Sequence, residues 1–353
     1  MASQAPSGGQ RGGGFALGGI NEIITKYSDI ALAVLVIAVV AMIVIPLPTW
    51  LLDILLTVQI TMAVIIILVA LYINDALRIA SFPTILLMAT LYRLALNIST
   101  TRLILSQADA GEVVRAFGSF VVQGNYVVGG ILFLIVTLIN FIVIAKGAER
   151  VSEVGARFTL DAMPGKQMSI DADLRAGIIN MEQAIERRSI LHRESQFYGA
   201  MDGSMKFVKG DAIAGMIVTL INIIGGLIIG VTMRGMPMMD AVKTYSLHTI
   251  GDGLVQQIPA LIISVSAGIV VTRVSSESEG SNLGRDIITQ VTSYPKALII
   301  ASAILGLMAI VPGLPKIPFI LMGVVVGALA LFIIKSKAKV VQEIADTPKQ
   351  EAV

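Results

Sequence analysis

The chain has 353 residues, of which 55% are hydrophobic and only 14% charged, and its formal net charge at pH 7 is +2. Soluble domains are typically ~45–50% apolar with ~25% charged residues, so this chain has more apolar surface than one soluble core can bury. The small net charge gives no reason to expect nucleic acid as a partner. The absence of cysteine excludes disulfides, thiol catalysis and cysteine metal sites.

Eight apolar segments predict helices that cross a membrane, because ~20 mostly apolar residues span a bilayer. The sequence therefore predicts an all-α polytopic membrane protein, with four spans in residues 29–145 and four in residues 212–334. The first and seventh segments are short, and the third contains Arg93. The eight segments are Ile30–Ile45, Leu51–Ile73, Phe82–Ile98, Val127–Ala145, Ala212–Met233, Leu254–Val271, Ala297–Val311 and Ile317–Ile334.

The two ends of the chain differ from the apolar segments in composition. Residues 1–28 begin with a Gly-, Ser- and Gln-rich run and are expected to form a flexible tail rather than a signal peptide. Residues 335–353 are Lys-rich and are expected to begin a linker. Pro312, Gly313 and Pro315 predict a tight turn between the last two spans.

Lysine and arginine predict the orientation of the spans. If both termini are cytosolic, only five of the 26 basic residues fall in outer loops, and one lies within a span. Both termini on one side also require an even number of spans. We therefore expect both termini, and the loop Lys146–Asp211, to be cytosolic.

Two loops carry structure of their own. The outer loop Ser99–Tyr126 contains two amphipathic patches, which predict short interfacial or re-entrant helices. The loop Lys146–Asp211 mixes acidic and basic residues and predicts a small helical subdomain. Within it, Asn180 and Gln183 fit a capping box, so a helix is expected from Met181 to Tyr198, ending at Gly199 and followed by a turn at Asp202-Gly203.

The sequence shows no signature of catalysis. It contains no P-loop, no GxSxG and no HExxH motif, and its two histidines, His192 and His248, stand far apart. We therefore expect no enzymatic activity, no metal and no cofactor.

Polar residues inside spans are better candidates for function, since an ionisable side chain at the bilayer centre costs ~2.5–3.5 kcal/mol on insertion scales. Arg93 and Asn97 lie four residues apart and share a helix face, where Arg93 forms either a structural pair or part of a polar conduit. Asn140 and Asn222 are mid-span amides, for which hydrogen bonds between helices are the simpler explanation. Two small-residue pairs, Gly226 with Gly230 and Gly323 with Gly327, favour close helix packing within or between chains.

Charged residues also gather at the expected membrane boundary. The run Arg150–Asp173 includes Arg150, Arg157 and Asp161, which could pair, gate or relay protons. Asp211 directly precedes the fifth expected span, close to Lys206. It is therefore interpreted either as the N-cap of that helix or as a proton carrier.

Several long segments stand out in order along the chain. They are FPTILLMATLYRLALNISTTRLIL, KGAERVSEVGARF, the run Arg150–Asp173, GAMDGSMKFVKGDAIAG and TIGDGLVQQIPALIIS. These segments resemble the export-gate family of bacterial type III secretion, called FHIPEP, and its injectisome branch more than its flagellar branch. The resemblance is dense over residues 30–274 and looser over the last two spans.

The resemblance implies a bacterial inner-membrane protein with eight spans that forms a homo-oligomeric ring, nonameric in the family. It implies other export-apparatus membrane subunits, secreted proteins in transit and membrane lipids as partners, and coupling of export to the proton motive force. Matching of the family's charged positions implies that Arg150, Arg157, Asp161, Lys206 and Asp211 serve this coupling. The resemblance also implies a large C-terminal cytosolic domain in family members, which is expected to lie beyond the given sequence.

Two other functions compete with the export gate. One is a stand-alone proton or ion transporter of the secondary-transporter class, although the halves of the chain show no inverted repeat. The other is a purely structural membrane scaffold.

Overall fold

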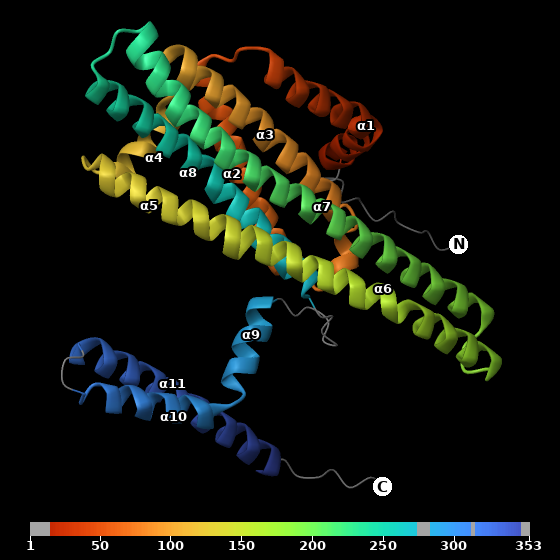
Figure 1. Ribbon diagram of the computed structural model, residues 1–353. Coiled ribbons are helices and arrows are strands. Elements are labelled where there is room, and N and C mark those ends of the chain that lie inside the picture. The colour runs from red at the N-terminus through yellow and green to blue at the C-terminus, as the bar shows by residue number, and fades with distance from the viewer. Residues whose placement is uncertain (1–14, 274–282, 312–314, 347–353) are drawn as a thin grey trace, which may run out of the picture. The chain divides into compact units, whose positions relative to one another are not determined.

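The computed structural model describes residues 15–273, 283–311 and 315–346, and within these ranges it is helical without strands (Figure 1). The chain divides into two compact units, Met1–Val274 and Ser275–Val353, and each is considered by itself. The N-terminal run 1–14 and the turn at 312–314 lie outside the described residues. The helices are α1 (Phe15–Val44), α2 (Thr49–Tyr72), η1 (Ala76–Ile79), α3 (Phe82–Gln107), α4 (Glu112–Val122), α5 (Tyr126–Ile139), η2 (Asn140–Ala145), α6 (Lys146–Arg175), α7 (Met181–Ile228), η3 (Ile229–Met233), α8 (Met238–Val271), α9 (Leu283–Thr292), α10 (Pro295–Met308) and α11 (Lys316–Asp346).

Six helical stretches of the described chain are long and apolar enough to cross a membrane, and a seventh candidate is the bent pair α9 and α10. The chain is thus a polytopic membrane protein. The first expected span corresponds to Asp29–Val44 of α1, which is apolar but shorter than the others. Eight spans therefore stay a prediction.

Helices α3 and α8 form the centre of the first unit. In the apolar segments of α3 and α8, 56% and 61% of the residues are buried. The corresponding fraction is 17% for the helical stretch that begins with α5 and 11% for the one that contains α7. One apolar cluster joins α2, α3, α7 and α8 around Phe82, Leu86 and Met201. A second joins α1, α2, α3, α4 and α8 around Leu56, Leu96 and Tyr245. The exposed apolar side chains of α5 and α7 are suited to lipid contact.

Glycines allow α8 to approach its neighbours at backbone distance. A Cβ added at Gly251 would lie 2.0 Å from the carbonyl oxygen of Val114 on α4, and one at Gly118 would lie 2.3 Å from that of Leu247. On α7, a Cβ at Gly226 would lie 2.3 Å from the ring of Tyr245. The spacing of Gly226 and Gly230 is therefore used within the chain, against α8.

The charged loop Lys146–Asp211 forms an antiparallel hairpin of α6 and α7 that continues the membrane helices on both sides (Figure 1). Helix α5 passes through the π-helical η2 into α6. At the other end, the predicted capping box is confirmed: Asn180 Oδ1 accepts from the Gln183 amide at 2.8 Å, and Gln183 Oε1 accepts from the Asn180 amide at 3.0 Å.

The predicted end of that helix at Gly199 is wrong, as is the turn at Asp202-Gly203. Helix α7 runs without interruption to Ile228. A glycine inside a helix costs only ~1 kcal/mol relative to alanine. Packing outweighs this cost here, because Met201 and Met205 are fully buried against α2, α3 and α8, and Ser204 Oγ donates to the Pro83 carbonyl at 3.0 Å.

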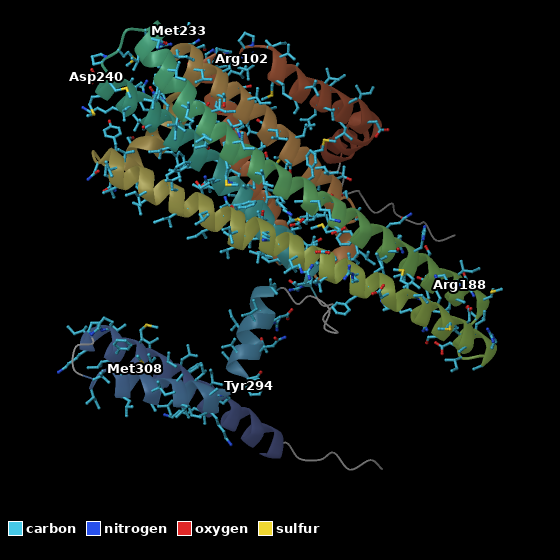
Figure 2. All side chains as sticks on the ribbon, in the orientation of Figure 1. Arg102, Arg188, Met233, Asp240, Tyr294 and Met308 are labelled. Carbon is cyan, nitrogen blue, oxygen red and sulfur yellow. The ribbon has the colours of Figure 1, made fainter. Side chains whose placement is uncertain are left out.

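Ion pairs between α6 and α7 stabilise the outer part of the hairpin. Lys166 pairs with Glu194 at 3.0 Å, and a small apolar cluster around Ile170 and Leu191 lies beside it. Two further pairs, Arg187 with Asp173 and Arg188 with Asp171, lie closer to the tip. Figure 2 shows Arg188 at this end of the unit, with Met233, Asp240 and Arg102 at the opposite end.

Of the two amphipathic patches of Ser99–Tyr126, only one forms a short helix of its own. The first is part of α3, which continues to Gln107, and only the second forms a separate helix, α4. Asp53 of α2 caps α4 from outside, since its Oδ1 accepts from the Val113 amide at 2.9 Å and its Oδ2 from the Glu112 amide at 3.1 Å.

In the second unit, α10 and α11 pack against each other at the other small-residue pair. Ser302 Oγ donates to the Gly323 carbonyl at 2.8 Å, and a Cβ at Gly327 would lie 2.8 Å from Ser302 Oγ. Both glycine pairs thus serve contacts inside one chain, and they give no support to contacts between chains. The expected linker 335–353 is helical in α11 as far as Asp346.

Candidate functional site

A polar cavity of about 50 Å³ lies between α3, α5, α7 and α8, at the junction of α5 with η2. A water molecule needs ~10–15 Å³, so the cavity has room for a few. Its polar lining comes from every surrounding helix. These residues are Arg93 and Asn97 of α3, Thr137 of α5, Asn140 of η2, Asp211 and Thr219 of α7, and Asp252, Gln256 and Gln257 of α8.

The charged centre of the site is an ion pair between Arg93 and Asp211, whose side chains are only 5% and 3% exposed. Asp211 lies deep within α7, so the alternative that it caps the N-terminus of the fifth span is wrong. Desolvation of two charges costs several kcal/mol per ion and is offset only by close pairing. Removal of one partner would leave the other charge buried and alone.

Asp252 is a second buried carboxylate beside this pair. It is 3% exposed, and its polar neighbours include Thr100 and Gln256. Gln256 in turn accepts from Gln59 Nε2 of α2 at 3.3 Å. Among the described residues Asp252 Oδ1 and Gln256 Nε2 have no hydrogen-bond partner, a condition that costs ~1–3 kcal/mol per buried group unless water supplies the bond.

Asn140 marks a local change of helix type at the wall of the cavity. The chain is π-helical from Asn140 to Ala145, an arrangement that often occurs at functional sites. Asn140 Nδ2 donates to the Gln257 carbonyl of α8 at 3.3 Å, which confirms the predicted hydrogen bond between helices. Gln257 also donates to Thr137 Oγ1 at 2.6 Å.

The structure brings together four of the residues singled out from sequence, namely Arg93, Asn97, Asn140 and Asp211. The remaining intramembrane candidate, Asn222, lies further along α7, and its amide makes no hydrogen bond to any described residue, contrary to the expected bond between helices.

The other charged candidates lie on the hairpin. Arg150 pairs with Glu153 one turn away, and Lys206 pairs with Asp202. Arg157 and Asp161 are exposed on α6. At the base of the hairpin Lys209 joins Glu149 at 2.9 Å. These residues form a charged layer outside the cavity, and their part in coupling stays a prediction.

Sequence reasoning missed Asp252, Gln256 and Gln257. Asp252 falls just before the expected sixth span at Leu254, where a charged residue is unremarkable. The available signal was the spacing of Asp252 and Gln256, which places both on one face of a helix that continues into the apolar segment.

The arrangement can hold and move protons. It combines a carboxylate paired to a fixed cation, a second carboxyl without a cationic partner among the described residues, and amide and hydroxyl groups that donate and accept. Buried carboxylates of this kind mark proton relays and ion pathways in membrane proteins.

Comparison with known proteins identifies the family of the chain. The model of the FHIPEP family matches residues 39–353. The chain belongs to the FHIPEP family. Similar FHIPEP relatives include the low calcium response locus protein D of Yersinia pestis, 55% identical over 304 residues. They also include the harpin secretion protein HrpI of Erwinia amylovora, 52% identical over 307 residues, and the invasion protein InvA of Salmonella typhimurium, 51% identical over 304.

These alignments cover 86% of this FHIPEP chain but only 43%, 43% and 44% of the three relatives. The chain thus spans less than half the length of the curated relatives it matches. No solved structure matched it.

Proposed function

We propose that this chain is the membrane part of an export gate in a bacterial type III secretion system, where it couples proton movement to protein export across the inner membrane. The names of relatives support the export role, since HrpI is a harpin secretion protein and InvA an invasion protein. Both termini and the α6–α7 hairpin are cytosolic in this proposal. The partners are further copies in a ring, nonameric by family resemblance, other membrane subunits of the apparatus, secreted proteins and lipids.

The observation that carries the coupling role is the Arg93–Asp211 pair in a polar cavity at the base of the hairpin. A proton on Asp211 would remove the charge that holds Arg93. The two helices would then have a reason to rearrange, because a buried unpaired cation is costly. Helix α7 carries Asp211 and also forms one arm of the hairpin, so a shift of α7 would reach the cytosolic side directly.

The decisive experiment places Asp211→Asn and Asp211→Glu in the full-length protein. Asparagine keeps the shape of the side chain but cannot carry a proton, so we expect normal membrane insertion and no secretion. Glutamate can carry a proton and should retain partial secretion. Asp240→Asn is the matched control, because Asp240 is exposed at the other end of the unit (Figure 2). Normal secretion by Asp211→Asn at wild-type protein levels would refute the coupling role.

Proton conductance in liposomes and secretion in cells, measured together, separate the export gate from its alternatives. A stand-alone transporter would conduct protons in liposomes while secretion continued in its absence. A structural scaffold would show no conductance and would tolerate Asp211→Asn wherever the protein assembled.

A further inference from the structure

One face of α8 carries a continuous series of buried polar side chains beyond the cavity. Tyr245, Thr249, Asp252 and Gln256 follow one another at intervals of three or four residues, and His248 lies three residues after Tyr245 and four before Asp252, which places all five along one side of the helix. All five are at most 7% exposed.

Each of these side chains has a polar atom without a hydrogen-bond partner among the described residues. The atoms are Tyr245 Oη, His248 Nδ1, Thr249 Oγ1, Asp252 Oδ1 and Gln256 Nε2. Buried polar groups in native proteins are almost always hydrogen-bonded, to protein or to ordered water. Asp252 and Gln256 lie near enough to interact with each other. The unpaired atoms of Tyr245, His248 and Thr249 have no such neighbour among the described residues, and three exceptions in one row require a further partner.

Helix α7 adds two more such atoms at the same level. Gly226 of α7 faces Tyr245 of α8, and the helices run antiparallel, so Asn222, one turn before Gly226, falls beside His248 and Thr249. The Asn222 side chain is fully buried, and neither its Nδ2 nor its Oδ1 has a partner among the described residues.

The missing partner must be small. Asn222 and Thr249 are 0% and 1% exposed within a single chain, so neither lipid nor a neighbouring copy can reach them. Water meets the requirement, because it both donates and accepts and commonly bridges buried polar groups.

The series has one end in the cavity and the other near the surface. Asp252 and Gln256 line the cavity that holds Arg93 and Asp211. Near the other end α8 lies against α4, since a Cβ at Gly251 would lie 2.0 Å from the carbonyl oxygen of Val114, the residue before Arg115. Arg115 forms an ion pair with Asp109 at 3.3 Å, and the two side chains are 54% and 40% exposed.

We infer that the polar face of α8, together with Asn222, holds a chain of internal water molecules that connects the Arg93–Asp211 cavity to the surface at Asp109 and Arg115. Its role as the outer half of a proton path rests on the proposed function. The hydration itself rests only on the packing.

Hydroxyl-radical labelling by brief X-ray exposure tests the hydration without mutation. Radicals made from internal water modify buried side chains only next to that water. In the full-length protein in lipid nanodiscs, we expect Tyr245 and His248 to be modified at least several-fold faster than Met201 and Met205. Those methionines are a stringent control, since they are intrinsically more reactive but are fully buried in an apolar cluster. Equal or slower labelling of Tyr245 and His248 would overturn the inference.

A second experiment tests the path. Thr249→Val preserves the shape of the side chain and removes its oxygen, so we expect several-fold slower labelling of His248 and a several-fold loss of secretion. Thr90→Val is the matched control, because Thr90 is equally buried and its hydroxyl already donates to the Leu86 carbonyl at 2.7 Å. Normal secretion by Thr249→Val would overturn the path. Failure of the proposed function would instead appear as secretion by Asp211→Asn, whatever the labelling shows.

Discussion

Arg93 of α3 and Asp211 of α7 form an ion pair that is almost entirely shielded from the protein surface. The two residues come from segments with different apparent roles, since Arg93 lies within the third expected span and Asp211 directly precedes the fifth. Their pairing fixes the register of α3 against α7 at the wall of the polar cavity. Such a pair contributes little net stability but makes the loss of one partner expensive.

The first prediction is therefore that substitutions of Arg93 and Asp211 have non-additive effects on the free energy of unfolding. Arg93→Gln and Asp211→Asn should each lower the free energy of unfolding, by up to ~3–5 kcal/mol, because each leaves one buried charge without a partner. The double variant should recover most of this loss, since it buries no charge. Thermal unfolding of the protein in nanodiscs measures all three.

Secretion should behave differently from stability in the same variants. The double variant is expected to insert and assemble normally yet remain unable to secrete, because neither side chain can carry a charge change. Additive losses of stability would contradict the pairing. Secretion by a well-folded double variant would contradict the coupling role.

The sequence located the apolar helices but could not show how they continue. Hydropathy identifies the lipid-facing stretches, and the capping box at Asn180 was predicted because it depends on neighbouring residues alone. The run of α7 through Gly199 and Gly203 was missed because its stabilisation comes from α2, α3 and α8, which are distant in sequence. Local propensity is a weak guide wherever packing of this kind decides.

The candidate site shows the same limit. Arg93, Asn97, Asn140 and Asp211 stand out individually, since polar residues in apolar segments are costly. That Arg93 meets Asp211 depends on the register of α3 against α7, and no pattern within either segment encodes that register. Asp252 was missed for a related reason, because its helix α8 begins at Met238, well before the apolar segment that hydropathy detects.

A second prediction concerns Asp53, which caps α4 from another helix. Asp53→Ala removes both acceptors for the Glu112 and Val113 amides, so we expect a local loss on the order of 1–2 kcal/mol. Asp53→Asn keeps one acceptor and should lose less. Hydrogen–deuterium exchange at the first turn of α4 measures the effect, with Asp240→Ala as the control. Unchanged exchange in Asp53→Ala would show that the cap does not stabilise α4.

A third prediction compares two adjacent glycines of α7. Alanine at Gly226 would place a Cβ 2.3 Å from the Tyr245 ring, whereas at Gly225 the nearest atom is Leu105 Cδ2 at 3.5 Å. Gly226→Ala should destabilise the protein, since overpacking costs ~1–3 kcal/mol. Gly225→Ala should be neutral or should stabilise by up to ~1 kcal/mol through helix propensity. Gly226→Ala should lower the unfolding temperature, and Gly225→Ala should leave it unchanged or raise it. Equal shifts in the two variants would contradict the close approach of α7 and α8.

The last prediction concerns orientation in the membrane. The α6–α7 hairpin carries several ion pairs, including Lys166 with Glu194, and these charged surfaces belong in water rather than lipid. The Lys and Arg bias of the sequence places that water on the cytosolic side.

Met168 on the hairpin is 67% exposed, and Met233 at the opposite end of the unit is 78% exposed, so both positions are open to a labelling reagent (Figure 2). This chain contains no cysteine, so a single introduced thiol gives an unambiguous signal from it. In spheroplasts treated with a membrane-impermeant thiol reagent, Met233→Cys should react at once, and Met168→Cys should react only after the membrane is permeabilised. Labelling of Met168→Cys in intact spheroplasts would place the hairpin outside. A cytosolic export apparatus could not then act on α7 through the hairpin, and the coupling proposal would fail together with the orientation.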